Sequence, residues 1–236
     1  MINVCMVARD RPRLTETTIT SLLGGRIDGY AVTVVDDASG EETKDLLERL
    51  SGQYGFRLVR NDKPRGVGGA KNQCVEEARK GYGWHSYEFL FLCDNDIEFS
   101  EDCFARMVNA FRFHERNSRF RLLGGYAHPF NGTNRFFGEG TPHEVHEKNA
   151  VDGLSWLMRC ETWDKYGPLM DNARGVRQSE DFEWCQRVRK DGYRVGVVWP
   201  HVVKNCGLID TFGEEIPGAD EVRKQQGMDT QAAMAT

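Results

Sequence analysis

Two aspartates separated by one asparagine directly follow an apolar stretch, since Asp94, Asn95 and Asp96 come after the sequence FLFLC at 89–93. Carboxylate oxygens are the ligands that Mg²⁺ and Mn²⁺ prefer, and these ions take further ligands from the phosphates of a substrate. The pattern therefore predicts a divalent metal site. A polar turn that only ends a strand uses the same residue types, so this alternative stays open.

A second acidic pair, Glu180-Asp181, stands where a helix is expected to begin, because Phe182, Cys185 and Val188 follow at helical spacing. The amino end of a helix favours a negative charge, so a carboxylate at Asp181 would stay ionised there. On these residues alone, an ordinary charged first helical turn explains the pair as well as a functional role does.

The apolar pattern predicts strands that alternate with helices. Strands are expected at 2–8, 31–35, 56–59 and 89–93, each followed by a helical pattern. Ser39 and Glu42 have the spacing of a capping box that would start the second helix. Continuously apolar strands are typical of a mostly parallel sheet covered by helices on both faces, so the fold class is α/β.

The carboxyl ends of these strands carry the candidate residues. In sheets of this kind ligands bind beyond those ends. Ala8-Arg9 ends the first strand, Asp36-Asp37 the second, and the Asp-Asn-Asp sequence the fourth. Carboxylates gathered at one edge repel one another unless a cation compensates, which favours the metal site over the simple turn.

Composition limits the classes of function. The 236 residues carry a net charge of −5, which argues against a nucleic-acid partner held by bulk charge. The seven cysteines form no CxxC pair, so neither a disulfide framework nor a zinc site is expected. No window approaches the roughly 18 apolar residues of a membrane span. We therefore expect a cytoplasmic protein without a transmembrane segment, able to lie at the periphery of a membrane.

Four segments, in order, make the chain resemble family 2 glycosyltransferases of the GT-A fold: VTVVDDASGEET, NDKPRGVGGAKNQCVEEA, FLFLCDNDIEF and SEDFEWCQRVRKDGYRVGVV. The resemblance covers about residues 1–205. It implies a single GT-A domain at 1–215, with a Rossmann-like, mostly parallel central sheet flanked by helices. Residues 1–100 would form the nucleotide-binding half and 101–215 the acceptor-binding half. Residues 216–236 are expected to be a loosely packed tail.

The resemblance also implies which residues hold the donor. Ala8 and Arg9 would line the nucleoside, and Asp36 and Asp37 would bind its base. The diphosphate and the donor sugar would be contacted by Arg65, Lys71, Asp94 and Asn95. The family often has arginine where this chain has Lys71, and lysine keeps the charge but lacks the planar fork.

Metal ligands follow from the same resemblance. Asp94 and Asp96 would hold Mn²⁺ or Mg²⁺, with Asp96 as the more direct ligand. His201, after the apolar sequence VGVVWP, is the predicted third ligand. An ordinary half-buried histidine is the alternative reading of that position.

The acceptor side is predicted from the second half of the chain. Asp181 matches the catalytic base of the family. The predicted acceptor-binding residues are Asp152, Gly153, Trp156 and Glu180, with Asp152 also near the donor sugar. Trp156 would either stack on a sugar ring or pack in the core.

The predicted activity is transfer of a sugar from a nucleotide-diphosphate sugar to an acceptor hydroxyl, with inversion and with Asp181 as base. A UDP-sugar is the first choice of donor and a GDP-sugar the second; the acceptor is a carbohydrate or another hydroxyl compound. A retaining transferase and a non-catalytic nucleotide-sugar or carbohydrate binder on the same fold remain alternatives. A nucleotidyltransferase is disfavoured because ARDRPRLTE, after the first strand, lacks the glycines of a phosphate loop.

Overall fold

The computed structural model describes residues 1–24, 29–128, 131–170, 180–207, 219–220 and 223–224. The helices are α1 (Pro12–Gly24), α2 (Glu41–Tyr54), α3 (Gly66–Tyr82), α4 (Cys103–Asn117), α5 (Cys160–Tyr166) and α6 (Glu180–Lys190). The strands of the first half are β1 (Ile2–Ala8), β2 (Tyr30–Asp36), β3 (Arg57–Arg60), β4 (Phe89–Cys93) and β5 (Ile97–Phe99). Those of the second half are β6 (Phe120–Gly124), β7 (Arg135–Phe137), β8 (Val145–Lys148), β9 (Ser155–Arg159), β10 (Arg194–Val198) and β11 (Val203–Asn205).

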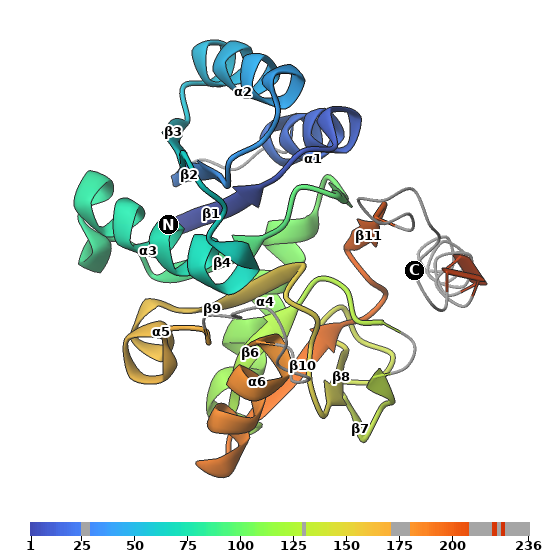
Figure 1. The fold of residues 1–236 in the computed structure, drawn as a ribbon. Coiled ribbons are helices and arrows are strands. Elements are labelled where there is room, and N and C mark those ends of the chain that lie inside the picture. Colours follow the sequence, from blue (N-terminus) through green and yellow to red (C-terminus); the bar gives the residue numbers. More distant parts are fainter. Residues whose placement is uncertain (25–28, 129–130, 171–179, 208–218, 221–222, 225–236) are drawn as a thin grey trace.

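A nine-stranded sheet forms the centre of the molecule, with the order β3-β2-β1-β4-β9-β6-β10-β8-β7 (Figure 1). Strands β3, β2, β1 and β4 are parallel, and β6 and β10 are parallel to each other. Strand β9 lies between the two groups and is antiparallel to both β4 and β6. All six strands of the two groups therefore run in one direction, and the predicted mostly parallel sheet is confirmed.

Helices cover both faces of the sheet, as predicted (Figure 1). Every residue of β1 is buried, and its side chains alternate between two cores: Val4, Met6 and Ala8 lie in one, Cys5 and Val7 in the other. Helices α1, α2 and α4 contribute to the first core, and α3, α5 and α6 to the second. Burial on both faces explains why the central strands are continuously apolar.

The predicted capping box at the start of α2 is wrong. Helix α2 begins at Glu41 with Gly40 as its N-cap, and no side chain caps it within the described chain. The Ser39 hydroxyl instead accepts a hydrogen bond from the backbone N–H of Asp10, at 2.9 Å. A partner 29 residues away therefore outcompetes the local cap, and it fixes the loop after β1 to the loop after β2.

A small second sheet brings the end of the described chain to the loop after β4. Strand β5 pairs antiparallel with β11, so that the N–H of Cys206 donates to the carbonyl of Asp96 at 2.8 Å. The predicted tail at 216–236 lies outside the described residues, apart from 219–220 and 223–224. Among the helices that the structure describes, none combines the length and the apolar character needed to span a bilayer.

Candidate active site

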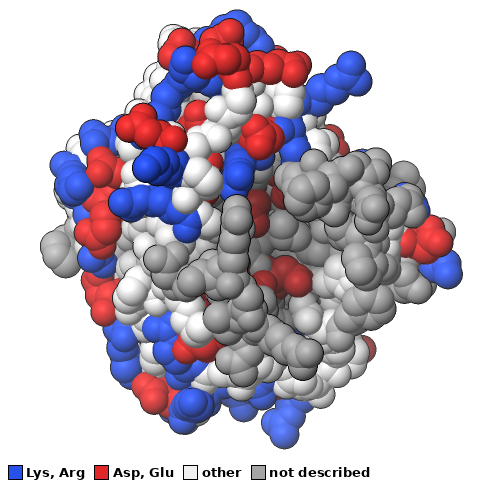
Figure 2. Space-filling view, viewed as in Figure 1, with Lys and Arg blue, Asp and Glu red and all other residues white. Residues whose placement is uncertain are grey.

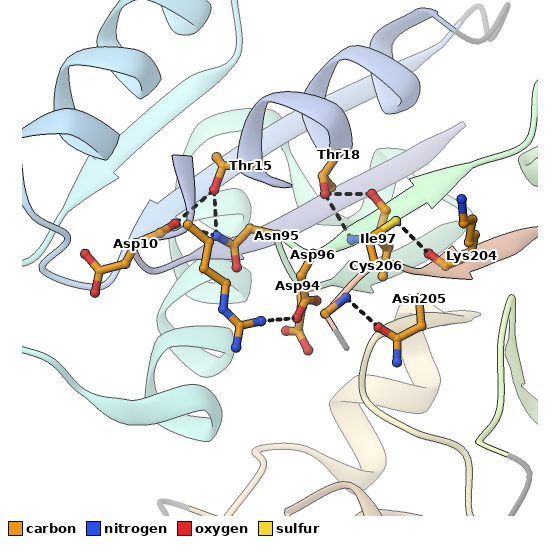
Figure 3. Close-up of polar contacts among 12 residues, drawn as sticks. Asp10, Thr15, Thr18, Asp94, Asn95, Asp96, Ile97, Lys204, Asn205 and Cys206 are labelled. Atoms are coloured by element: carbon orange, nitrogen blue, oxygen red, sulfur yellow. Dashed lines mark hydrogen bonds and ion pairs between the residues drawn. The ribbon is translucent and has the colours of Figure 1, made fainter. Parts of the chain in front are cut away.

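The loop after β4 turns at once, and this turn sets the geometry of the site. The amide of Asn95 donates to the Asp10 carbonyl at 3.1 Å and to the Thr15 hydroxyl at 2.7 Å, so it fixes the loop to α1. Strand geometry ends at Cys93, and the side chains of Asp94 and Asp96 lie next to each other (Figure 3). The Asn95 side chain therefore holds this loop in place, and its predicted contact with the donor stays a prediction.

Each of the two carboxylates has a cation of its own. The Lys71 ammonium lies 2.8 Å from Oδ1 of Asp94, and the Arg11 guanidinium lies 2.6 Å from Oδ2 of Asp96. Lys71 is only 2% exposed. Burial alone would lower the pKa of Lys71, but Asp94, with help from Glu180 and Asp181, raises it above its usual value. The lysine is therefore charged at neutral pH.

Asp96 is the acid of the pair whose negative charge is disfavoured by its surroundings. Its burial, followed by the charge of Asp94, raises its pKa to about 6, although Arg11 opposes this shift. Its Oδ1 atom is buried and finds no hydrogen-bond partner among the described residues. A buried acceptor without a partner requires an explanation, such as a bound ion. Two adjacent carboxylates, one with an orphaned oxygen, fit a hard divalent cation.

The raised pKa of Asp96 predicts how the metal-free protein responds to pH. The folded state binds this proton more tightly than the unfolded state, whose aspartate titrates near 3.9, so the free energy of unfolding falls as pH rises from 4 through 6. We expect Asp96→Asn to remove the part of that decrease that falls between pH 5 and pH 7.5, about 1.4 kcal/mol. Urea unfolding in EDTA at pH 5 and pH 7.5 measures it. Equal pH dependence in the wild type and the variant would contradict the shift.

A chain of contacts joins this acid pair to the start of α6. The Lys71 ammonium also donates to the carbonyl of Gly153 at 2.7 Å, and the N–H of Gly153 donates to Oδ2 of Asp181 at 3.1 Å. The backbone N–H of Asp94 donates to the carbonyl of Leu154 at 3.2 Å. Asp94, Lys71, Gly153 and Asp181 thus form one continuous chain, which we call the Lys71 bridge.

Gly153 has no room for a larger residue. A Cβ atom there would lie 2.9 Å from the Lys71 ammonium and 3.6 Å from the Cβ of Asp181. We expect Gly153→Ala to shift the lysine and to lower the predicted sugar transfer about tenfold, because small displacements near a reacting group are costly. A coupled assay of nucleotide release measures this effect. Gly52→Ala is the control, since nothing lies within 4 Å of a Cβ there; an equal loss in both variants would contradict the prediction.

Asp181 lies in the first turn of α6, as the sequence predicted. Its Oδ1 accepts a hydrogen bond from the N–H of Phe182 at 2.6 Å, while its Oδ2 faces Gly153. Asp152, next to Gly153, accepts from the N–H of His128 at 2.5 Å and from the amide of Asn131 at 2.9 Å. Burial raises the pKa of Asp152, and the charge of Asp181 adds to this. The two acids therefore share one environment.

Charged side chains of both signs lie on this side of the molecule. Figure 2 shows acidic side chains near the centre of the face seen in Figure 1, and lysines and arginines interspersed with further acidic side chains along its border. A separate hollow of about 890 Å³ lies at the other end of the sheet, around the start of β4 and the end of α4. Its lining includes Arg159, which pairs with Glu88 and Glu115, but none of the residues of the Lys71 bridge.

Comparison with known proteins identifies the family. The sequence model described as glycosyl transferase family 2 matches residues 3–121, half of the 236-residue chain. This chain belongs to glycosyl transferase family 2. Among curated protein sequences, none matches it significantly.

Solved structures share its fold. PcManGT, a mannosyltransferase from Pyrobaculum calidifontis in complex with GDP-Man and Mn²⁺, is 16% identical with a TM-score of 0.60, over 99% of this chain and 63% of that one. TarS 1–349 from S. aureus in complex with UDP is 15% identical with a TM-score of 0.60, over 86% and 59%. The complex of TarS 1–349 with UDP-GlcNAc is 16% identical with a TM-score of 0.59, over 86% of this chain and 57% of that one. The chain thus spans less than two thirds of these proteins, and the likeness establishes its GT-A fold.

Two of the predicted site residues in this family 2 chain pack against aromatic rings. Trp156 is 1% exposed; its ring packs 5.0 Å from that of Trp184, and its N–H donates to the Val151 carbonyl. This burial favours core packing over stacking on a sugar. His201 packs against Tyr126 and Trp199. Among the described residues no three His, Cys, Asp or Glu side chains form a metal-binding group, and His201 as third ligand stays a prediction.

Lys71 also differs from its predicted role. It was expected to contact the donor diphosphate, but it is buried and two of its three N–H groups already serve Asp94 and Gly153. The lysine thus links the loop after β4 to the loop before β9. Arginine, which the family often has here, would carry a larger side chain into this buried position.

The predicted base-binding aspartates shape the loops around them. Asp37 is 2% exposed: its Oδ1 accepts from the amide of Asn61 and the N–H of Arg65, and its Oδ2 accepts from the N–H of Gly66. These bonds fix the start of α3. A carboxylate has about four acceptor sites, so one remains for a ligand. Asp36 is also buried, and its Oδ1 accepts from the N–H of Ser39 at 3.0 Å.

The other predicted donor residues lie on both sides of these loops. The carbonyl of Ala8 accepts the N–H of Asp37 at 2.8 Å, and Arg9 is exposed beside Asp10. Arg65 is exposed and lines a hollow of about 410 Å³ along α3, which includes no residue of the loop after β4. The structure therefore brings the backbone of Arg65 to Asp37, while Arg65 also lines this hollow along α3.

Two residues at the centre of the site were missed from the sequence. Arg11 pairs with Asp96, and Gly207 lies against that pair: a Cβ on Gly207 would be 2.1 Å from Oδ2 of Asp96 and 3.1 Å from the Arg11 guanidinium. A cation three residues beyond the strand predicted at 2–8 was a usable signal for Arg11. Gly207 follows a strand of three residues and carried no signal.

Proposed function

We propose that the chain is a glycosyltransferase that moves a sugar from a nucleotide-diphosphate sugar to an acceptor hydroxyl, with Asp181 as general base and a divalent cation at Asp94 and Asp96. The observation that carries the proposal is the Lys71 bridge. It joins Asp94, one of two adjacent acids suited to a diphosphate-bound cation, to Asp181, a carboxylate suited to proton removal, at one edge of the sheet. Family membership supports this assignment.

The donor would lie along the carboxyl ends of β1, β2 and β4. In this proposal the nucleoside contacts Ala8, Arg9 and the one free acceptor site of Asp37, and Asp94 faces the ribose or the donor sugar. PcManGT holds GDP-Man and TarS holds UDP-GlcNAc, which supports a UDP- or GDP-sugar as donor. Ligands at this edge follow the general rule for open α/β sheets.

Asp94 and Asp96 would hold Mn²⁺ or Mg²⁺, since the neighbour PcManGT contains Mn²⁺ and hard oxygen donors suit both ions. When bound, such an ion stabilises the negative charge of the leaving diphosphate. Lys71 neutralises Asp94 and keeps its carboxylate in position, because the ammonium is buried and fixed from two sides.

Asp181 would accept the proton of the acceptor hydroxyl as the new bond forms. The N–H of Gly153 orients the carboxylate through Oδ2, and the lone pairs that this bond leaves free can receive the proton. Glu180 and Asp152 flank it, which supports their assignment to the acceptor side. Direct attack on the sugar by this hydroxyl gives inversion of the anomeric carbon.

Donor hydrolysis tests the proposal without a known acceptor. The protein is incubated with UDP-glucose, UDP-GlcNAc and GDP-mannose in Mn²⁺ or EDTA, and NMR follows the released sugar and its first anomeric configuration. We expect metal-dependent release, inverted relative to the donor. Retained configuration would contradict Asp181 as a simple base. Metal-dependent donor binding without hydrolysis or transfer to any sugar acceptor would show a binding protein instead.

A further inference from the structure

The two cations of the acid pair differ in how tightly they are held. Lys71 is buried and has two partners. The side chain of Arg11 is 21% exposed, and within the described residues its guanidinium makes one hydrogen bond, to Oδ2 of Asp96. A guanidinium has five N–H donors, so four of those of Arg11 have no partner among the described residues. Lys71 is fixed by its two partners, whereas the Arg11 guanidinium can leave Asp96 for another anionic partner.

The backbone that carries Arg11 is held in an unusual conformation. Asp10 and Arg11 have φ angles of 52° and 57°, in the left-handed region that residues other than glycine rarely occupy. Two bonds of 2.9 Å each hold Asp10 to the loop after β2: its N–H donates to the Ser39 hydroxyl, and its Oδ1 accepts from the N–H of Gly40. Asn95 holds the carbonyl of Asp10 at 3.1 Å.

Such conformations persist only where the surroundings fix them, and they cluster at ligand-binding sites. The backbone at Arg11 is thus fixed, while its guanidinium can change partners.

A divalent ion at Asp96 would change the balance at this ion pair. Its charge repels a guanidinium bound to the same carboxylate, and a nucleoside diphosphate at that ion brings anionic oxygens beside it. The planar fork of arginine matches phosphate oxygens. We propose that Arg11 binds the donor diphosphate. Before the metal and the nucleotide bind, Asp96 pairs with the Arg11 guanidinium and keeps it next to the site. This inference rests on the proposed function and adds to it a diphosphate ligand.

Three titrations test the inference. They compare wild type with Arg11→Gln, using Mn²⁺ alone, a nucleoside with Mn²⁺, and the matching nucleoside diphosphate with Mn²⁺. Mn²⁺ is followed by electron paramagnetic resonance and the nucleotides by calorimetry. Because the competing charge is gone, we expect Arg11→Gln to bind Mn²⁺ several-fold more tightly. Its affinity for the diphosphate should fall about 10- to 100-fold, the value of a charged hydrogen bond, with the nucleoside unchanged.

The controls separate the possible failures. Arg13→Gln, an exposed arginine of α1 without a side-chain partner among the described residues, should leave all three affinities unchanged. Arg11→Lys should recover part of the diphosphate affinity. Tighter Mn²⁺ binding with unchanged diphosphate affinity would overturn the inference, as would equal losses for nucleoside and diphosphate. If wild type binds no nucleoside diphosphate with any metal, the proposed function fails and takes the inference with it.

Discussion

Asp181→Asn is expected to lower the rate of sugar transfer by about 10²- to 10⁴-fold, the usual contribution of a general base. The carbonyl of asparagine can still accept the N–H of Gly153, so the loop at 153 keeps its position. The bond from the N–H of Phe182 to Oδ1 is at risk, which costs about 1 kcal/mol of stability. Nucleotide affinity should stay within about twofold, because the substitution lies on the acceptor side.

Glu183→Gln is the matched control for Asp181. Glu183 lies in the same helical turn and pairs with Arg187 at 3.0 Å, so it tests whether any charge there matters. Steady-state rates and nucleotide titrations on both variants give the answer. Full turnover in Asp181→Asn, or an equal loss in Glu183→Gln, would show that the acids are only a charged first turn.

Lys71→Met is expected to lower the free energy of unfolding by about 3–5 kcal/mol, the cost of removing one partner from a buried ion pair. Methionine fills a similar volume but leaves Asp94 without its counter-ion and the Gly153 carbonyl without its donor. Transfer should fall as well, because both ends of the Lys71 bridge lose their support. Urea unfolding at pH 7.5 measures the stability, and the transfer assay at a temperature where the variant is folded measures the rate.

Lys80→Met on the same helix is the control for Lys71. Its ammonium is 66% exposed and pairs with Glu77 one turn away, so we expect a change of about 0–1 kcal/mol. A loss below about 1 kcal/mol in Lys71→Met would mean that the buried ion pair contributes little beyond a well-packed apolar side chain. Normal transfer in Lys71→Met would show that the Lys71 bridge is not needed for activity.

Much of the fold could be predicted from the sequence because its signals are local. The buried strands are continuous apolar runs, and each ends where polar residues begin: β1 ends at Ala8, β2 at Asp36 and β4 at Cys93. The site at their carboxyl ends follows from the parallel arrangement of the strands. The antiparallel strand β9, inserted between β4 and β6, has no such signal because its partners are distant in the sequence.

The roles of individual side chains were harder to predict, since they depend on distant partners. Lys71 is buried because Gly153, 82 residues away, accepts its bond, and Arg11 meets Asp96 across 85 residues. Trp156 looked equally suited to a sugar or to the core, and only the neighbouring helix α6 decides for the core. Local sequence patterns indicate which side chains lie at the ends of the strands. The order of the strands in the sheet decides which of these side chains come into contact.

The central claim is that Asp94 and Asp96 form a cation-dependent site for a nucleoside diphosphate, and thermal unfolding tests it most directly. Wild type and Asp96→Asn are heated with UDP, GDP, ADP, CDP or dTDP in Mn²⁺, Mg²⁺ or EDTA. A nucleotide at about 100 times its dissociation constant adds roughly 2.7 kcal/mol, or about 5–10 °C for a chain of this size. We predict this shift for UDP or GDP with metal in the wild type only. An equal shift in EDTA or in Asp96→Asn, or no shift with any nucleotide, would contradict the claim.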